Sequence, residues 1–419
     1  MNRTPKSLRI QVALVGRTNV GKSSFLNFIA NQDVAIVSPT PGTTTDIVEK
    51  PMELPPIGPV NFLDTGGIDD NSILAQERIK RTNKIFERAD VIALIVEPNI
   101  WTEFEQSIVE IGKKNSIPLI IIVNKTDISE PSEEFLVQIK SHTDFVLFTS
   151  SVDKSKYNQI LEEFKSLLSK AGLSEVRQPL LGDLLPPNGF AIFIVPIDSQ
   201  APKGRLILPQ VQAIRDVLDH NGAVLVVKET EYKQYLESLG KKPDLVVCDS
   251  QVVHKMIAET PEDVKCTTFS ILFCRFKGDL TTEVLGSAYT EELKNGDNVL
   301  IAEACSHHPL QDDIGRIKIP RLLKHFLGRE LNFEFCVGGD FPEDLKKYKL
   351  IIHCGSCMLT KREKLMRIEK AVSQGVPITN YGIIISKCQG VLERVLSPFP
   401  DVLSSYQKLL LSKQKVLTL

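Results

Sequence analysis

Short apolar segments alternate with segments of helical periodicity along nearly all of the 419 residues. Several of these segments, such as 10–15 and 119–123, are apolar at consecutive positions, which is typical of strands that helices cover on both faces. Strands that alternate with helices predict a parallel-rich α/β fold. The strands expected from this pattern are 10–15, 91–97, 119–123, 145–149, 191–196, 223–227, 245–248, 299–303, 331–337, 350–353 and 377–380.

Two breaks in the pattern divide the chain. Pro186, Pro187 and Gly189 interrupt the periodicity within 172–189, and a weaker break follows near 277–279. A chain of this length is also too long for one hydrophobic core. We therefore predict three α/β domains, with a first domain of 1–172, a linker of 173–188, a middle domain of 189–277 and a C-terminal domain of 278–419.

Composition and charge exclude several classes of protein. The chain is 42% hydrophobic and 24% charged, and its 50 basic and 52 acidic residues give a formal net charge of −2, without the basic excess of a dedicated nucleic-acid binder. The first ten residues lack the apolar core of a signal peptide, and no apolar run is long enough to span a membrane. We expect a cytoplasmic protein with neither nucleic acid nor a membrane as partner. Its eight cysteines then do not form a disulfide framework.

The segment GRTNVGKS after the first expected strand matches the P-loop pattern GxxxxGK[ST], and an amphipathic helix is expected directly after it. The glycines allow successive backbone N–H groups to point at phosphates, and the helix N-terminus adds a partial positive charge. We predict that Lys22 contacts the β- and γ-phosphates and that Ser23 binds Mg²⁺. A fortuitous glycine-rich turn is the alternative for this motif alone. The nucleotide-binding residues predicted in the loop are Gly16, Arg17, Thr18, Asn19, Val20, Gly21, Lys22 and Ser23.

Three further motifs occur in the order that a GTPase requires. DTGG follows a strand-like segment at 60–63 and fits DxxG, in which Asp64 contacts Mg²⁺ through water and the Gly67 N–H senses the γ-phosphate. NKTD fits NKxD, in which the Asp127 carboxylate accepts guanine N1–H and N2–H, groups that adenine does not offer. The third motif, TSS, lies where a backbone N–H contact to guanine O6 is expected, so the set predicts an enzyme that binds and hydrolyses GTP. The base-binding residues expected from these motifs are Asn124, Lys125, Asp127, Ser150 and Ser151.

These motifs resemble those of the translation-factor-like GTPases of the Era and MnmE type. Residues 41–46, PGTTTD, are similar to the switch I sequence of that group, with Thr45 where arginine is usual, and the match places a Mg²⁺-binding threonine at Thr44. Asn19 resembles the asparagine that helps to hold K⁺ beside the phosphates, and bracing the loop is its alternative role. Ile68 stands where Ras-like proteins have glutamine, so we expect slow intrinsic hydrolysis that a monovalent cation stimulates.

Cysteine and histidine cluster after two expected strands of the C-terminal domain. One cluster, CSHHP, starts at Cys305, and the other, HCGSC, ends at Cys357. Open α/β sheets place their ligands at the carboxyl ends of strands, where both clusters lie. Cys354 and Cys357 form a CxxC pair whose thiolates can face one metal, with Gly355 permitting a tight turn, and Cys305 can supply a third thiolate.

Three thiolates with imidazoles nearby suit either an iron–sulfur cluster or a Cys₃His zinc site. Two alternatives involve no such site. One is a coincidental group of buried cysteines. The other is a thioredoxin-like redox pair, which leaves Cys305 and the histidines without a role.

The two clusters resemble the CxH and HCxxC signature of the HydF family, GTPases that take part in the maturation of FeFe-hydrogenase. Here 45 residues separate CSH from HCGSC, at the short end of the usual gap. The resemblance covers the full length, and it implies a dimerisation role for the middle domain and a cluster-binding role for the C-terminal domain. It further implies a 4Fe-4S cluster on Cys305, Cys354 and Cys357, with His307 or His353 as a fourth ligand or as a donor to the ligands.

The same resemblance implies a homodimeric, GTP-dependent scaffold. Such a protein receives a diiron precursor from two radical-SAM maturases and delivers it to apo FeFe-hydrogenase. Two rival functions stay open, namely an Era- or MnmE-like GTPase linked to RNA with a structural zinc site, and an iron–sulfur redox or sensor protein regulated by its GTPase domain. The first rival lacks a basic patch and a KH-type GxxG loop. The remaining cysteines are expected to be strand or core residues: Cys248, Cys266, Cys274, Cys336 and Cys388.

Overall fold

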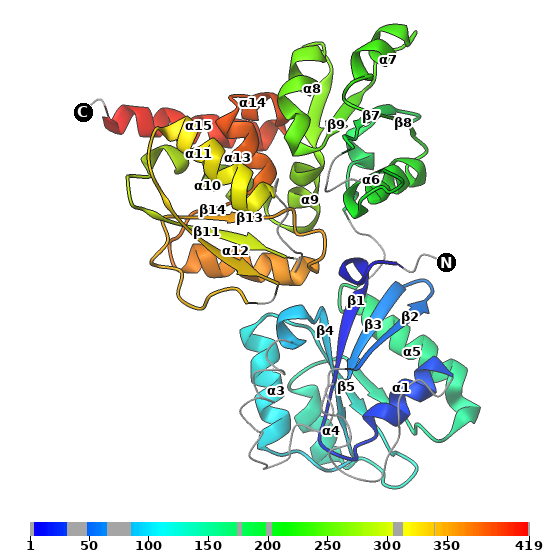
Figure 1. Ribbon diagram of the computed structural model, residues 1–419. Coiled ribbons are helices and arrows are strands. Elements are labelled where there is room, and N and C mark those ends of the chain that lie inside the picture. The colour runs from blue at the N-terminus through cyan, green and yellow to red at the C-terminus, as the bar shows by residue number, and fades with distance from the viewer. Residues whose placement is uncertain are drawn as a thin grey trace. The chain divides into compact units, whose positions relative to one another are not determined.

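A computed structural model describes residues 4–31, 48–64, 85–173, 178–197, 203–304, 313–338 and 340–417 of the chain (Figure 1). The chain forms two compact units, 1–177 and 178–419. One sheet lies in the first unit and two lie in the second, and of the neighbouring strands described only one pair is antiparallel. The predicted parallel-rich α/β fold is confirmed.

The first unit is built on a six-stranded sheet. Its strands are β1 (Ile10–Val15), β2 (Val48–Leu54), β3 (Gly58–Asp64), β4 (Val91–Val96), β5 (Leu119–Val123) and β6 (Val146–Phe148), and its helices are α1 (Lys22–Ala30), α3 (Glu103–Lys114), α4 (Glu133–Lys140) and α5 (Tyr157–Lys170). The strand order is β2-β3-β1-β4-β5-β6, and β2 is the antiparallel strand. Val12 and Leu14 of β1 pack in a core with α1 and α5, whereas Ala13 and Val15 pack in a core with α3 and α4. Burial on both faces explains why β1 is apolar at nearly every position.

The second unit contains two four-stranded sheets in which all strands are parallel. The first of these sheets has the order β10-β9-β7-β8, with β7 (Phe190–Ile194), β8 (Ala223–Val227), β9 (Leu245–Cys248) and β10 (Lys265–Thr268). The other has the order β12-β11-β13-β14, with β11 (Asn298–Glu303), β12 (Asn332–Val337), β13 (Leu350–His353) and β14 (Ile378–Asn380). The helices are α6 (Leu208–Asp219), α7 (Tyr232–Ser238), α8 (Val253–Glu259), α9 (Phe269–Lys277), α10 (Leu280–Ser287), α11 (Ile319–Leu327), α12 (Lys361–Ser373), α13 (Tyr381–Cys388), α14 (Leu392–Val395) and α15 (Pro400–Leu417).

One hydrophobic core joins the two sheets of the second unit. It includes Phe193 of β7, Ile301 of β11 and Ile383 of α13. Phe269 of α9 packs edge-on against Phe193, with ring centroids 5.3 Å apart. Because both sheets share this core, they form one compact unit, and their division into a middle and a C-terminal domain stays a prediction.

Every strand predicted from the apolar pattern is present, with its ends shifted by at most two residues. The pattern missed β2 and β10, which are edge strands of their sheets and carry more polar residues than central strands such as β4 and β5. Residues 49–53 of β2 are exposed or half-buried, whereas Cys266, Thr267 and Thr268 of β10 are buried but include two polar side chains. Neither sequence is therefore a continuous apolar run. In the part of the chain that the structure describes, no helix has the length and apolar character needed to cross a membrane.

Candidate functional site

Two glycines of the P-loop stand where no side chain fits. A Cβ atom on Gly16 would lie 2.5 Å from the carbonyl oxygen of Ile95 in β4. A Cβ atom on Gly21 would lie 2.2 Å from Asn124 Nδ2, and Gly21 also has a left-handed backbone with φ of 96°. The loop therefore passes directly over β4 and against the NKTD segment, which only glycine at both positions permits.

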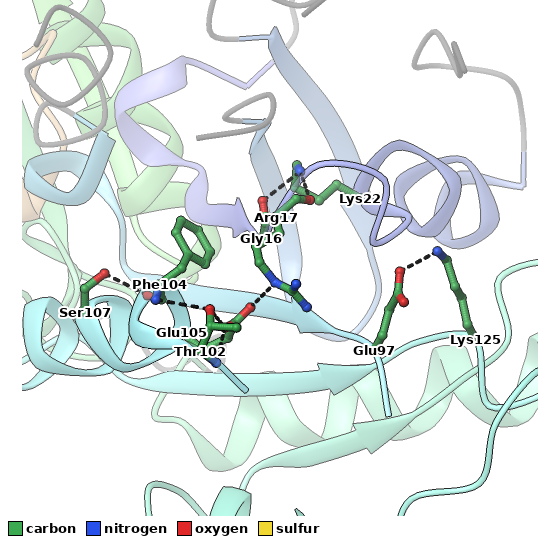
Figure 2. Close-up of polar contacts among 9 residues, drawn as sticks. All are labelled: Gly16, Arg17, Lys22, Glu97, Thr102, Phe104, Glu105, Ser107 and Lys125. Carbon is green, nitrogen blue, oxygen red and sulfur yellow. Dashed lines mark hydrogen bonds and ion pairs between the residues drawn. The ribbon is translucent and has the colours of Figure 1, made fainter. Parts of the chain in front are cut away.

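Lys22 and Ser23 are the first two residues of α1, so the helix N-terminus lies at the loop. The Lys22 ammonium is buried and donates to the carbonyl oxygens of Gly16 and Arg17, each at 2.8 Å (Figure 2). The Ser23 hydroxyl donates to Asp64 Oδ2 at 3.3 Å. The residues predicted to serve Mg²⁺ from the P-loop and from DxxG are therefore adjacent, and their oxygen donors are of the kind that Mg²⁺ prefers.

An ion pair that the motifs did not predict fixes the P-loop to α3. Arg17 Nε lies 2.7 Å from Oε1 of Glu105, whose side chain is fully buried (Figure 2). The other oxygen of Glu105 accepts from the backbone N–H of Thr102 at 2.8 Å and completes the capping box of α3. The TxxE spacing in the sequence marks this helix start. Nothing in the local sequence, however, indicates that the same carboxylate also holds the P-loop.

Asn124 joins the P-loop to the two loops expected around the guanine base. Its Nδ2 donates to the carbonyl oxygen of Val20 in the P-loop at 2.9 Å. Its Oδ1 accepts from the backbone N–H of Ser151 at 3.2 Å and from the Ser151 hydroxyl at 2.9 Å. In the same segment Lys125 has a left-handed backbone and pairs with Glu97 at 2.5 Å (Figure 2), while Asp127 is exposed. NKTD thus contacts the P-loop and TSS contacts NKTD, an arrangement that is in keeping with their predicted roles.

Some predicted residues of this site cannot be placed. Thr44, Ile68 and Gly67 lie outside the described residues. Asn19 is described and has a φ of 63°, a left-handed conformation that asparagine tolerates better than most residues. This backbone is in keeping with a bracing role as well as with K⁺ binding, so both readings of Asn19 stay predictions.

The two predicted cysteine clusters follow neighbouring strands. β11 and β13 pair in parallel, with Ala302 opposite His353. One residue beyond β11, the backbone N–H of Ala304 donates to the Cys354 sulfur at 3.1 Å. Cys305 and His307 lie outside the described residues. The residue directly before Cys305 is therefore in contact with the CxxC pair.

His353 is fully buried and uses both of its ring nitrogens within the protein. Nε2 lies 3.0 Å from a guanidinium nitrogen of Arg367, which can only donate, so Nε2 accepts. Nδ1 then carries the proton and lies 3.0 Å from both the Ser356 hydroxyl and the carbonyl oxygen of Cys354. Burial, aided by the charges of Lys364 and Arg367, lowers the pKa of His353 well below its usual value. This arrangement favours the second predicted role of His353, orienting the cysteine loop, over direct iron ligation.

The tight turn of the cysteine loop does not depend on Gly355, which corrects that expectation. The left-handed residue is Ser356, with φ of 56°, whereas Gly355 has no positive φ. The Ser356 hydroxyl donates to the carbonyl oxygen of Cys354 at 3.1 Å and lies beside His353, and these contacts hold it in this conformation. A Cβ atom on Gly355 would meet only Ser270 Oγ, at 3.9 Å.

Cys354 and Cys357 line one cavity of about 180 Å³ together with the buried Glu303. Burial raises the pKa of both thiols, and the N–H groups of Ser356 and Ala304 oppose the rise at Cys354. Within the described ranges no group of three His, Cys, Asp or Glu side chains could hold a metal ion by itself. The described residues supply two thiols, so a three-thiolate site needs Cys305.

The other cysteines of the described ranges are free thiols, and most are buried. Burial raises the pKa of Cys248 and Cys274 well above the usual value, and it raises that of Cys266 and Cys336 to about 11. Such thiols are poor nucleophiles and ligands. Their surroundings are in keeping with the predicted core roles.

Sequence models of protein families match three segments of the chain. Residues 180–278 match the hydrogen maturase F dimerization domain, and residues 281–398 match the hydrogen maturase F tetramerization domain. Together these two models cover just over half of the chain. The chain belongs to the hydrogen maturase F family. Residues 11–125 match the 50S ribosome-binding GTPase model, so this member of the hydrogen maturase F family carries a GTPase domain, as predicted.

Curated relatives resemble the GTPase segment. The tRNA modification GTPase MnmE of Synechococcus sp. (strain JA-2-3B'a(2-13)) is 40% identical over 124 residues, which are 29% of this chain and 26% of that protein. MnmE of Prochlorococcus marinus (strain NATL1A) is 44% identical over 121 residues, 28% of this chain and 26% of that protein. The hydrogen maturase F chain thus spans about a quarter of the length of these relatives.

Solved structures give a weaker likeness. The G domain of the T. maritima FeoB iron transporter is 25% identical, with 39% of this chain and 99% of that chain covered and a TM-score of 0.30. Era of Aquifex aeolicus bound to GDP·AlF4⁻ is 18% identical, with 55% of this chain and 98% of that chain covered and a TM-score of 0.33. The membership of the hydrogen maturase F family rests on the sequence models alone. Their descriptions also support the predicted self-association.

Proposed function

We propose that this protein is a GTP-dependent scaffold that carries a 4Fe-4S cluster and delivers a diiron precursor to apo FeFe-hydrogenase. The contact between the Ala304 N–H and the Cys354 sulfur carries the proposal, because it brings the strand that leads to Cys305 against the CxxC pair. Membership of the hydrogen maturase F family supports the same role. The residues proposed to hold the cluster are Cys305, Cys354 and Cys357, with His307 as a candidate for the fourth position and His353 as a donor that orients the loop.

The donors around the cavity fit an iron–sulfur cluster. Soft thiolate ligands suit such clusters, and N–H groups directed at the sulfurs are among the features that tune them. The cluster supplies iron to which a further iron fragment can attach, and the protein contributes thiolates, burial and orientation. The diiron precursor is cargo, and we propose that two radical-SAM maturases provide it.

GTP hydrolysis is the reaction proposed for the first unit. Lys22 and the backbone N–H groups of the P-loop would hold the phosphates, and Ser23 and Thr44 would bind Mg²⁺. Asp64 would contact Mg²⁺ through water, and the Gly67 N–H would contact the γ-phosphate. Mg²⁺, when bound, neutralises charge that develops on the phosphate oxygens. We propose that the switch segments differ between GTP- and GDP-bound protein and that this changes the affinity for the maturases and the hydrogenase.

Self-association completes the proposal, and we propose a homodimer. β8 is an edge strand of its sheet, so one row of its backbone N–H and C=O groups is open to pairing. Val226 of β8 is 39% exposed, and Leu218 of α6 and Ile197, which follows β7, are exposed at 53% and 56%. An exposed apolar edge of this kind supports pairing with a second copy of the chain.

Base specificity gives one test. Asp127→Asn replaces an acceptor of two guanine N–H groups by an amide that repels one of them. GTP affinity should fall by about 10- to 100-fold, measured by titration with a fluorescent GTP analogue. Asp144→Asn, at another exposed aspartate of the first unit, is the control. Unchanged GTP selectivity in Asp127→Asn would count against this assignment.

Cation dependence gives a second test. Replacing K⁺ by Na⁺ should slow GTP hydrolysis if Asn19 helps to hold the larger ion beside the phosphates. Asn19→Gly removes the side chain but keeps a residue that tolerates φ of 63°. The variant should hydrolyse GTP at the same slow rate in both salts, measured as phosphate release. Equal rates of the wild type in K⁺ and Na⁺ would remove the K⁺ role and leave only bracing.

The maturation role is tested by co-expression. Hydrogenase and the two maturases are produced with and without this protein, and hydrogen evolution is measured. We expect activity only when the protein is present. Normal hydrogenase activity in its absence would rule out the carrier function and favour the rival, an iron–sulfur redox or sensor protein with a regulatory GTPase domain.

A further inference from the structure

The cavity at the CxxC pair is walled by both sheets of the second unit. Glu303 and Cys354 come from the ends of β11 and β13. Other lining residues come from the ends of β9 and β10, where Ser250 follows β9 and both Phe269 and Ser270 open α9. Parallel sheets offer ligand sites at their carboxyl edges, and here two such edges meet at one cavity. α9 belongs to the segment that matches the dimerization-domain model.

The last residue of α9 holds the cysteine loop. Lys277 is 1% exposed, and its ammonium donates to the carbonyl oxygen of Cys357 at 3.0 Å and to that of Leu359 at 2.8 Å. The ammonium also lies 5.7 Å from the centroid of the Phe273 ring. A buried carbonyl oxygen that loses its donor is costly, so these bonds restrict where the loop after Cys357 can lie.

The first turn of α9 faces the other end of the same loop. Ser270 Oγ is the atom that a Cβ on Gly355 would meet, at 3.9 Å, and it accepts from Ser250 Oγ at 3.1 Å. Close packing fixes this turn, because a Cβ on Gly382 of α13 would lie 2.5 Å from Ser270 Cβ. α9 therefore donates to one end of the cysteine loop through Lys277, and it lines the same cavity as the other end of the loop through Ser270.

We infer that α9 is a positioning element of the cluster site and that Lys277 sets the position of Cys357 toward the iron. The site is then built jointly by the two sheets, and the C-terminal sheet alone does not complete it. The inference rests on the proposed function in that it takes the cluster to sit on Cys305, Cys354 and Cys357. Groups that orient metal ligands in this way contribute to metal retention without touching the metal.

The test compares Lys277→Met with wild type in the full-length chain after anaerobic reconstitution with iron and sulfide. Methionine keeps an unbranched apolar stem but removes the three N–H donors. We expect iron loss to a ferrous chelator to be about 10- to 100-fold faster and the EPR signal of the reduced cluster to change, while GTP turnover stays at the wild-type rate. Lys265→Met, at an exposed lysine of β10, is the control and should match wild type in all three measurements.

Two outcomes overturn the inference. Wild-type iron retention and EPR signal in Lys277→Met would show that the loop needs no support from α9. If circular dichroism shows that Lys277→Met does not fold, the same measurements on Ser270→Ala test the inference instead. This variant removes only one oxygen atom, so it disturbs the fold less. We expect a changed EPR signal and a smaller acceleration of iron loss in Ser270→Ala, and no change in either would also overturn the inference. If the wild type takes up no iron, the proposed cluster-carrying function is wrong. This result is distinct from a wild type that binds iron and a Lys277→Met variant that retains iron equally well, which contradicts only the inference about α9.

Discussion

Lys22→Ala is expected to lower the rate of GTP hydrolysis by about 10²- to 10³-fold, the usual effect of removing one preorganised charge or donor from a transition state. Lys22 lies at the N-terminus of α1, at the end of the P-loop. Its ammonium donates to the carbonyl oxygens of Gly16 and Arg17 at the start of the loop, so it joins the two ends. No other cation of the motif is predicted to reach the γ-phosphate. Steady-state phosphate release measures the effect.

The same variant tests whether the nucleotide and cysteine sites are independent. Lys22 belongs to the first compact unit and the CxxC pair to the second, so the cluster spectrum of Lys22→Ala should be that of wild type. Lys114→Ala, at an exposed lysine that ends α3, is the matched control and should keep both activities. Loss of the cluster signal together with GTP turnover would contradict this separation.

Glu283→Ala is expected to cost about 3–5 kcal/mol in the free energy of unfolding of the second unit. Glu283 of α10 and Lys364 of α12 lie 2.7 Å apart, and their side chains are 0% and 2% exposed. The substitution leaves the Lys364 ammonium buried without this carboxylate, and the loss of a partner costs more than the pair itself contributes. Urea unfolding followed by circular dichroism measures the change.

A double variant separates charge from packing. Glu283→Met with Lys364→Met removes both charges and keeps similar volumes, so it should recover most of the stability lost by Glu283→Ala. If Glu283→Ala lowers the free energy of unfolding by less than about 1 kcal/mol, the prediction is wrong, because exposed ion pairs contribute that little.

The sequence predicts strands best where the residues form a continuous apolar run. β1, β4 and β5 are apolar because helices cover both of their faces, and their ends could be placed almost to the residue. β10, with the sequence KCTT, is an edge strand, and four residues with three polar side chains carry no periodic signal. Its place in the sheet comes from pairing with β9, a tertiary contact that no local pattern reports.

The site follows the same distinction between local and distant contacts. The P-loop and the HCGSC cluster are continuous in sequence, so both could be predicted from residue type and spacing. The Arg17–Glu105 pair and the bonds from Lys277 to Cys357 and Leu359 join residues about 80 or more positions apart. Only the fold brings these partners together, which is why sequence analysis missed them. Ser356 shows a subtler case, because its hydroxyl supports a left-handed turn that the sequence suggested for Gly355.

Iron content and EPR of the reconstituted protein test the central claim, convergence of the two cysteine segments on one cluster, most directly. Wild type should bind about four irons per chain and show the signal of a reduced 4Fe-4S cluster. Cys305→Ser and Cys354→Ser should both lose it, although 48 residues separate the two positions. Cys336→Ser, at a buried thiol outside the motif, should keep it. An iron content equal to that of the wild type and an unchanged EPR signal in Cys305→Ser would contradict the convergence of the two cysteine segments on one cluster.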